Sequence, residues 1–81
     1  MFEEVIVIPL YITVLKISDA RKNLTREQQI YLGTDYSKAH EAAFGAMRED
    51  WPEGVTDLKA FIRYYHIKTD GTIVYILETG I

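Results

Sequence analysis

The two histidines, His40 and His66, are the residues best suited to acid–base or metal chemistry in this chain. A general base or a metal site needs a second ligand or an orienting acid at a suitable spacing. Ser37, His40 and Glu41 fall within one turn of a predicted helix. Ser37, however, suits the start of that helix, and His40 suits its packed side. We therefore predict no catalytic residue, no metal and no cofactor, and we expect that the chain is not an enzyme.

A basic group, Arg21, Lys22 and Arg26, surrounds a predicted turn and could contact phosphate or an acidic patch on a protein. The whole chain has nine basic and twelve acidic residues and a formal charge of −3. This balance disfavours a nonspecific grip on nucleic acid, and no glycine-rich phosphate loop is present. We keep Arg21 and Lys22 as candidate partner-binding residues.

The length of 81 residues and the absence of cysteine predict one domain, residues 1–81, held together without disulfides. The first residues lack the basic charge of a signal peptide. The longest apolar run, residues 5–15, is shorter than the ~18 residues that cross a bilayer. We expect a cytoplasmic protein without a membrane partner.

Hydrophobic periodicity predicts two antiparallel hairpins joined by one helix. Four segments rich in β-branched, aromatic and aliphatic residues are the predicted strands: 10–18, 25–32, 60–69 and 72–78. Pro9 separates the first strand from a short lead segment, residues 3–8. A helix should begin at Asp35 or Ser37 and end before Pro52. The predicted fold class is α+β, ββαββ: a four-stranded antiparallel sheet with one amphipathic helix packed on one face.

The first hairpin is predicted to turn at Arg21-Lys22-Asn23, with Asn23 in the left-handed conformation. This turn places Thr13 opposite Tyr31 and Val14 opposite Ile30. One face of the hairpin is then wholly apolar. The residues of this expected core face are Ile12, Val14, Ile30 and Leu32.

The second hairpin contains Asp70-Gly71, a dipeptide typical of a two-residue type I′ turn. Such a turn places Tyr64 opposite Leu77 and His66 opposite Tyr75. The face with less polar content at its centre is the expected core. Its residues are Tyr65, Ile67, Val74 and Ile76.

A helix of about fifteen residues is roughly 22 Å long and covers two or three strands that lie ~4.8 Å apart. Apolar sheet surface should therefore stay uncovered, and tyrosine-rich apolar surface is typical of protein-binding sites. This uncovered face and the basic turn supply the candidate partner-binding residues. They are Leu15, Arg21, Lys22, Tyr31, Tyr64, His66, Tyr75 and Leu77.

The aliphatic run Val5-Ile6-Val7-Ile8 needs cover on both faces and a paired edge. Pairing with a strand of the second hairpin in the same chain would supply this. The alternatives are a homodimer that continues the sheet across a two-fold axis and a partner that adds a strand to this edge. A homodimer is also expected because it would cover the apolar face left open by the single helix.

No motif in the chain identifies a family. In size and layout, with a hairpin, a helix that begins at Gly33-Thr34-Asp35-Tyr36 and a second hairpin, it resembles small phage-encoded anti-defence inhibitors, anti-CRISPR proteins among them. The resemblance implies an inhibitor or adaptor that binds a protein and blocks its site sterically. Residues 30–47 are also similar to the strand–helix passage of HicB-type antitoxins, without the proline-glycine loop expected ahead of it. A nucleic-acid-binding or antitoxin-like regulatory module is therefore the alternative function.

Overall fold

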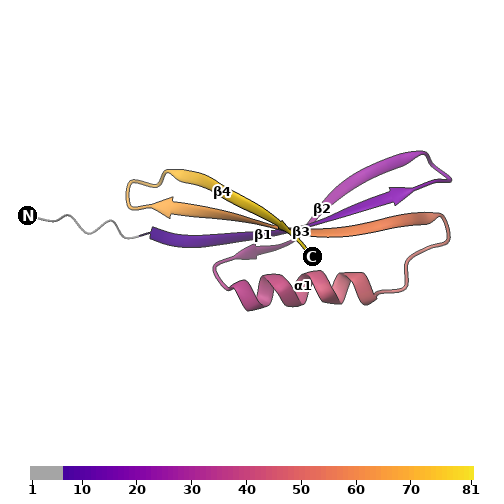
Figure 1. Cartoon of the computed structure of the whole chain (residues 1–81), viewed down its shortest axis with the longest axis horizontal. Coiled ribbons are helices and arrows are strands. Elements are labelled where there is room, and N and C mark those ends of the chain that lie inside the picture. The colour runs from indigo at the N-terminus through magenta and orange to yellow at the C-terminus, as the bar shows by residue number, and fades with distance from the viewer. Residues whose placement is uncertain (1–6) are drawn as a thin grey trace, which may run out of the picture.

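Four segments rich in β-branched and aromatic residues form strands in the computed structural model, which describes residues 7–81 (Figure 1). The elements are β1 (Val7–Asp19), β2 (Leu24–Gly33), α1 (Tyr36–Arg48), β3 (Val55–Lys68) and β4 (Ile73–Gly80). The strands form one antiparallel sheet in the order β2-β1-β3-β4. The predicted α+β class and the ββαββ order are confirmed.

The long strands β1 and β3 form the centre of the sheet, and each hairpin adds one edge strand. β1 and β3 pair along their whole lengths, from Val7 opposite Lys68 to Asp19 opposite Val55. The two hairpins therefore extend in opposite directions along the long axis of the molecule (Figure 1).

The lead segment pairs within the chain in its described part, because Val7 and Ile8 lie opposite Lys68 and Ile67 of β3. Of the arrangements that the sequence left open, the structure shows this one for Val7 and Ile8. The predicted pairing of residues 3–6 lies outside the described residues.

The first hairpin has a four-residue connection, 20–23, one residue longer than predicted. The carboxylate of Asp19 stabilises it by accepting hydrogen bonds from the backbone N–H groups of Arg21 and Lys22, at 3.0 and 3.3 Å. Asn23 has a φ of 50°, which confirms its predicted left-handed conformation.

The register of this hairpin agrees with the prediction only at the end far from the turn. Thr13 lies opposite Tyr31 as predicted, but a bulge follows it. Val14 therefore lies opposite Gln29, and Ile30 is the extra residue. The predicted pair of Val14 and Ile30 is wrong because the longer turn displaces β2 by one residue.

The second hairpin turns through a three-residue loop, 69–71, and the predicted two-residue type I′ turn is wrong. The Lys68 N–H donates to the Thr72 carbonyl at 2.8 Å, and the Gly71 N–H donates to the Lys68 carbonyl at 2.9 Å. Gly71 has a φ of 88°. A glycine at this place is the usual third residue of such a loop, because it adopts a positive φ without a steric cost.

The extra loop residue also shifts the pairing of β4. Tyr64 lies opposite Leu77 as predicted, but His66 lies opposite Val74 and not opposite Tyr75. A bulge after Tyr64 absorbs the one-residue difference.

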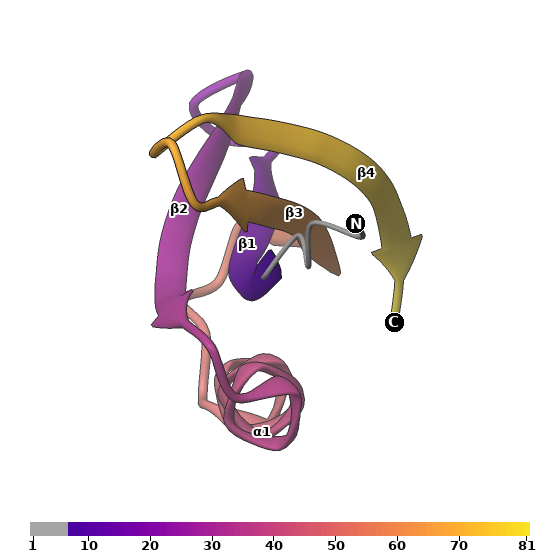
Figure 2. The ribbon, with the colours of Figure 1, turned by 90° about the vertical axis from the view of Figure 1, so that its left-hand side faces the viewer.

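Helix α1 begins at the predicted cap, since the Asp35 carboxylate accepts from the backbone N–H of Lys38 at 3.2 Å. It ends at Arg48, before Pro52 as predicted. The helix packs against β1, β2 and β3, whereas β4 lies on the far side of the sheet from it (Figure 2). Ala39 and Ala43 are its fully buried residues.

The sheet face beneath α1 is the core of the protein, and it is the face that the sequence led us to expect uncovered. Its buried members are Thr13, Leu15, Ile17, Ala60 and Ile62. The prediction of the core face is therefore wrong for both hairpins. The error has a physical cause, because the Thr13 hydroxyl, which made this face look polar, donates to the Ala39 carbonyl of α1 at 2.9 Å.

The opposite sheet face, which we call the open face, carries most of the residues predicted as core: Ile12, Val14, Leu32, Tyr65 and Ile67. Two others lie on the helix side, because Ile30 packs against the core beneath α1 and Val74 lies opposite His66. Ile12 lies opposite Leu32 there, and Leu32 is 56% exposed. In the second hairpin, Tyr65 and Ile67 lie on this face because they are opposite Leu10 and Ile8 of β1.

The centre of the open face is covered by an ionic bridge across the sheet. Arg63 of β3 contacts Glu27 of β2 at 3.5 Å and Glu78 of β4 at 3.2 Å. The hydrogen bond that Arg63 donates to the Glu78 carboxylate is the main reason that the pKa of Arg63 is raised. Val14, on the same face, is only 3% exposed. Apolar exposure is therefore concentrated away from the centre of the sheet.

Candidate functional site

One end of the sheet extends past the end of α1, so that neither of its faces is covered by the helix. β1 has 13 residues and is ~43 Å long, whereas α1 has 13 residues and is ~20 Å long. We call the uncovered end the wing and define it as residues 7–10 of β1, 64–68 of β3 and 73–77 of β4. It lies on the left in Figure 1, where the second hairpin projects past α1.

The wing exposes apolar side chains along both of its outer strands, and each is between 38% and 58% exposed. They are Val7, Ile8, Ile73, Tyr75, Ile76 and Leu77. Tyr75 lies on the open face, opposite Tyr65, whereas Leu77 lies on the helix side, opposite Tyr64. The apolar surface of the wing therefore continues around β4 from one face to the other.

The two edges of the wing differ in how well they resist pairing with another strand. At one edge β2 ends with Gly33 opposite Tyr11, so β3 is the only strand of residues 7–81 that pairs with Val7–Leu10. Pro9 interrupts that edge because proline has no N–H to donate. The other edge is β4, and residues 73–80 contain no proline and no lysine. β4 is thus an unprotected edge strand.

On the helix side, the wing and the start of α1 form an aromatic groove. It has a volume of about 260 Å³ and is lined by Tyr11, Tyr36, Ile62, Tyr64, Leu77 and Thr79. The rings of Tyr11 and Tyr64 stack with centroids 5.1 Å apart, and Tyr36 meets Tyr11 edge-on at 5.3 Å. Such contacts hold the rings in place and leave a rigid apolar surface.

The polar atoms of this groove are few. Desolvation raises the pKa of Tyr11, and the nearby phenols of Tyr64 and Tyr36 add to the effect. Tyr64 and His66 share a hydrogen bond of 2.7 Å between the phenol oxygen and Nε2. His66 therefore contacts Tyr64 of its own strand and not Tyr75, as its position opposite Val74 requires.

The structure brings three of the predicted partner-binding residues together at the wing's helix side: Tyr64, His66 and Leu77. Tyr75 lies on the wing's open face, where its ring meets Tyr65 at 5.6 Å. Four of the eight residues are therefore in the wing.

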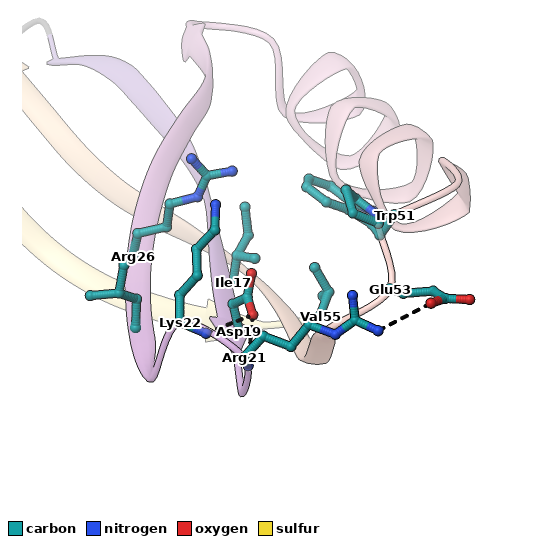
Figure 3. Close-up of a pocket in the computed structure, with 10 residues that line it drawn as sticks. Ile17, Asp19, Arg21, Lys22, Arg26, Trp51, Glu53 and Val55 are labelled. Atoms are coloured by element: carbon teal, nitrogen blue, oxygen red, sulfur yellow. Dashed lines mark hydrogen bonds and ion pairs between the residues drawn. The ribbon is translucent and has the colours of Figure 1, made fainter.

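The other four predicted residues lie elsewhere. Leu15 is 1% exposed beneath α1, so its predicted place on an uncovered face is wrong. The hydroxyl of Tyr31 accepts from the backbone N–H of Asp35 at 3.2 Å, beside the start of the helix. Arg21 and Lys22 line a different cleft at the far end of the sheet (Figure 3).

Sequence reasoning did not assign Tyr11, Tyr36, Ile73 and Ile76 to the site. Ile76 was expected in the core, but it is the extra residue of the bulge in β4 and is 40% exposed. Tyr11 and Tyr36 meet only because β1 and α1 pack together. No spacing along the chain signals that contact.

Within residues 7–81, no helix combines the length and apolarity needed to cross a membrane. The same residues contain no cluster of three or more histidine and acidic side chains that could hold a metal ion. Comparison with protein-family models, curated proteins and solved structures found no match to this chain.

Proposed function

We propose that this protein is a small, non-enzymatic protein-binding module of the cytoplasm, which acts as an inhibitor or adaptor. Its layout resembles that of small phage-encoded anti-defence proteins. The protein would act as such an inhibitor does, by covering a site on its partner. The observation that supports this proposal is the wing, where six large apolar side chains are exposed, four of them on the unprotected edge strand β4. Continuous apolar surface of this kind is typical of interaction sites.

Strand addition to β4 is the binding mode that suits this surface. An extended segment of the partner would pair with the free backbone groups of β4. Tyr75 would then contact the partner on one face of the extended sheet, and Leu77 would contact it on the other. Two such side chains on opposite faces would fix the register of the added strand.

The first partner available to an unprotected edge is a second copy of the same chain. Antiparallel pairing of β4 with β4 of another copy places Tyr75 and Leu77 near their own equivalents across a two-fold axis. Residues 73–80 contain one charged residue, Glu78, which is held by Arg63. Self-pairing therefore brings no repulsion when the axis lies near Tyr75 or Ile76. We expect the free protein to be a homodimer and a foreign partner to displace the second copy.

The substitution Tyr75→Arg tests the wing as the binding surface. Tyr75 is 54% exposed, so the variant should fold. In a complex, however, the arginine would be buried against the partner without an opposite charge to pair with. Met47→Arg is the matched control, because Met47 is an exposed apolar residue of α1 outside the wing. The three proteins serve as tagged baits in an extract of bacterial cells, and captured proteins are then tested for direct binding in purified form.

The proposal predicts a protein that binds the wild type and the Met47→Arg variant directly and fails to bind the Tyr75→Arg variant. Leu77→Arg provides a second test on the other face and should give the same loss. The proposal is wrong if the wild type captures no protein, or if the Tyr75→Arg variant binds every protein that the wild type captures. Circular dichroism spectra of all variants confirm that any loss is not caused by unfolding.

A further inference from the structure

A cleft of about 400 Å³ lies at the end of the sheet opposite the wing (Figure 3). Its two sides come from the turn of the first hairpin and from the loop that joins α1 to β3. The Ala20 N–H donates to the Gly54 carbonyl at 2.9 Å, and Arg21 forms an ion pair with Glu53 at 3.1 Å. These contacts join segments that are more than thirty residues apart in the chain.

Gly54 is required for this close approach. Its φ of 108° lies in a region that residues with a side chain rarely adopt. A Cβ atom at this position would also lie 3.0 Å from Cδ of Arg21 and 3.1 Å from a carboxylate oxygen of Asp19. The local sequence therefore permits the turn and the loop to pack directly against each other, which shapes one end of the cleft.

The interior of the cleft is apolar and includes one large aromatic ring. Ile17 and Val55 belong to the core beneath the cleft, and Trp51 forms a wall on the helix side (Figure 3). The indole N–H of Trp51 donates to the Ala46 carbonyl at 2.9 Å. This bond holds the ring in a fixed position, so its apolar surface is already placed for contact with a ligand.

The opposite wall carries two cations that form no ion pair with any residue in the described part of the chain. Lys22 and Arg26 extend along the same side of the cleft, with their charged ends facing the space in front of Trp51 (Figure 3). The two acidic residues of the cleft are engaged elsewhere. Asp19 accepts from backbone N–H groups of the turn, and Glu53 pairs with Arg21.

The cleft is therefore locally cationic in a chain whose formal charge is −3. Two like charges on one wall repel each other in the free protein, and an anion placed between them removes that repulsion. Low-dielectric walls of a cleft strengthen the attraction for such an anion. This combination of an apolar pocket and a few converging charges is typical of small-molecule sites of 300–1,000 Å³.

We propose that this cleft binds a small aromatic anion, a planar ring that carries a phosphate or a carboxylate group. The ring would lie against Trp51 and the aliphatic side chains beneath it, and the anionic group would contact Lys22 and Arg26. Guanidinium and ammonium groups both form strong, short hydrogen bonds to such oxygens. The proposal concerns a ligand and residues that the protein-binding wing does not share, so either can fail without the other.

Trp51 is the only tryptophan of the chain, so its fluorescence reports directly on the cleft. Phenyl phosphate and benzoate are titrated at low ionic strength as the two aromatic anions, and they distinguish the preferred anionic group. Inorganic phosphate tests the charge alone, and phenol tests the ring alone. We expect a saturable change in Trp51 emission with at least one aromatic anion. The affinity should exceed that for phosphate or phenol by about tenfold or more and should fall as salt is added.

The substitution Arg26→Gln should weaken binding of the preferred probe by about tenfold, the loss expected for one charge-assisted hydrogen bond. Lys22→Gln should have a similar effect, and Lys38→Gln, a lysine on α1 outside the cleft, should have none. Two results would overturn the proposal. One is the absence of a saturable signal with both aromatic anions. The other is equal binding by wild type, Arg26→Gln and Lys22→Gln proteins.

Discussion

Two leucine-to-alanine substitutions test which face of the sheet is the core. Leu15 is 1% exposed and packs with Ile17, Ala43 and Ala60 beneath α1, whereas Leu77 is 47% exposed in the wing. Removing a buried leucine side chain leaves a cavity and costs about 2–5 kcal/mol. Because only about half of Leu77 is removed from water, we expect Leu77→Ala to cost about 1 kcal/mol.

The assay is urea unfolding followed by circular dichroism, with stability taken from the midpoint and the slope of the transition. Both variants are measured at the lowest workable concentration, because the stability of a dimer depends on protomer concentration. The chemical change is identical in the two variants, so the difference reports burial alone. A loss for Leu77→Ala that equals or exceeds the loss for Leu15→Ala would refute the assignment of the core to the helix-covered face.

Four further substitutions test single side chains and backbone positions. Thr13→Val removes the hydroxyl that donates to the helix and should cost about 1 kcal/mol, which thermal unfolding would show as a melting temperature lower by about 4–8 °C. Unchanged melting would contradict the role of this bond. The pKa of Tyr11 is raised by burial, so its contribution to stability is complete below about pH 10 and is lost as the pH rises through the pKa of the folded state. Between neutral and strongly alkaline pH, the free energy of unfolding in urea should therefore fall less for Tyr11→Phe than for the wild type. An identical pH dependence of the two proteins would contradict this role of Tyr11. Gly54→Ala should cost about 1–3 kcal/mol because of its positive φ, while Gly45→Ala in the exposed part of α1 should gain up to about 1 kcal/mol in the same measurement. Equal effects of the two glycine substitutions would show that the positive φ of residue 54 does not require glycine.

The elements of the fold were predictable because their signals are local. Strand composition, the Asp35 cap and the left-handed Asn23 depend on the chemistry of a few neighbouring residues, and the structure confirms each of them. Register was predictable only in part. Each turn has one more residue than expected, and a bulge at Thr13/Val14 or Tyr64/Tyr65 restores the pairing beyond it.

The face of the sheet that α1 covers was not predictable from apolar content. The choice depended on Thr13, which looks unfavourable in a core until its hydroxyl meets the Ala39 carbonyl. The helix also packs through small residues, with Ala39 and Ala43 fully buried and Phe44 left 45% exposed. Periodicity identifies the apolar side of a helix, but the closest approach to a sheet is made where side chains are small. Leu15, predicted on an uncovered face, was misplaced for this reason.

The molecular mass in solution tests the role of the wing most directly. Size exclusion with light scattering is applied to the wild type and to the Tyr75→Arg variant at equal concentration. The account predicts a wild-type mass of twice the 9.4 kDa of one chain and a mass of one chain for the variant. A wild type that stays at the mass of one chain, with the variant unchanged from it, would contradict the claim that β4 pairs with a second copy.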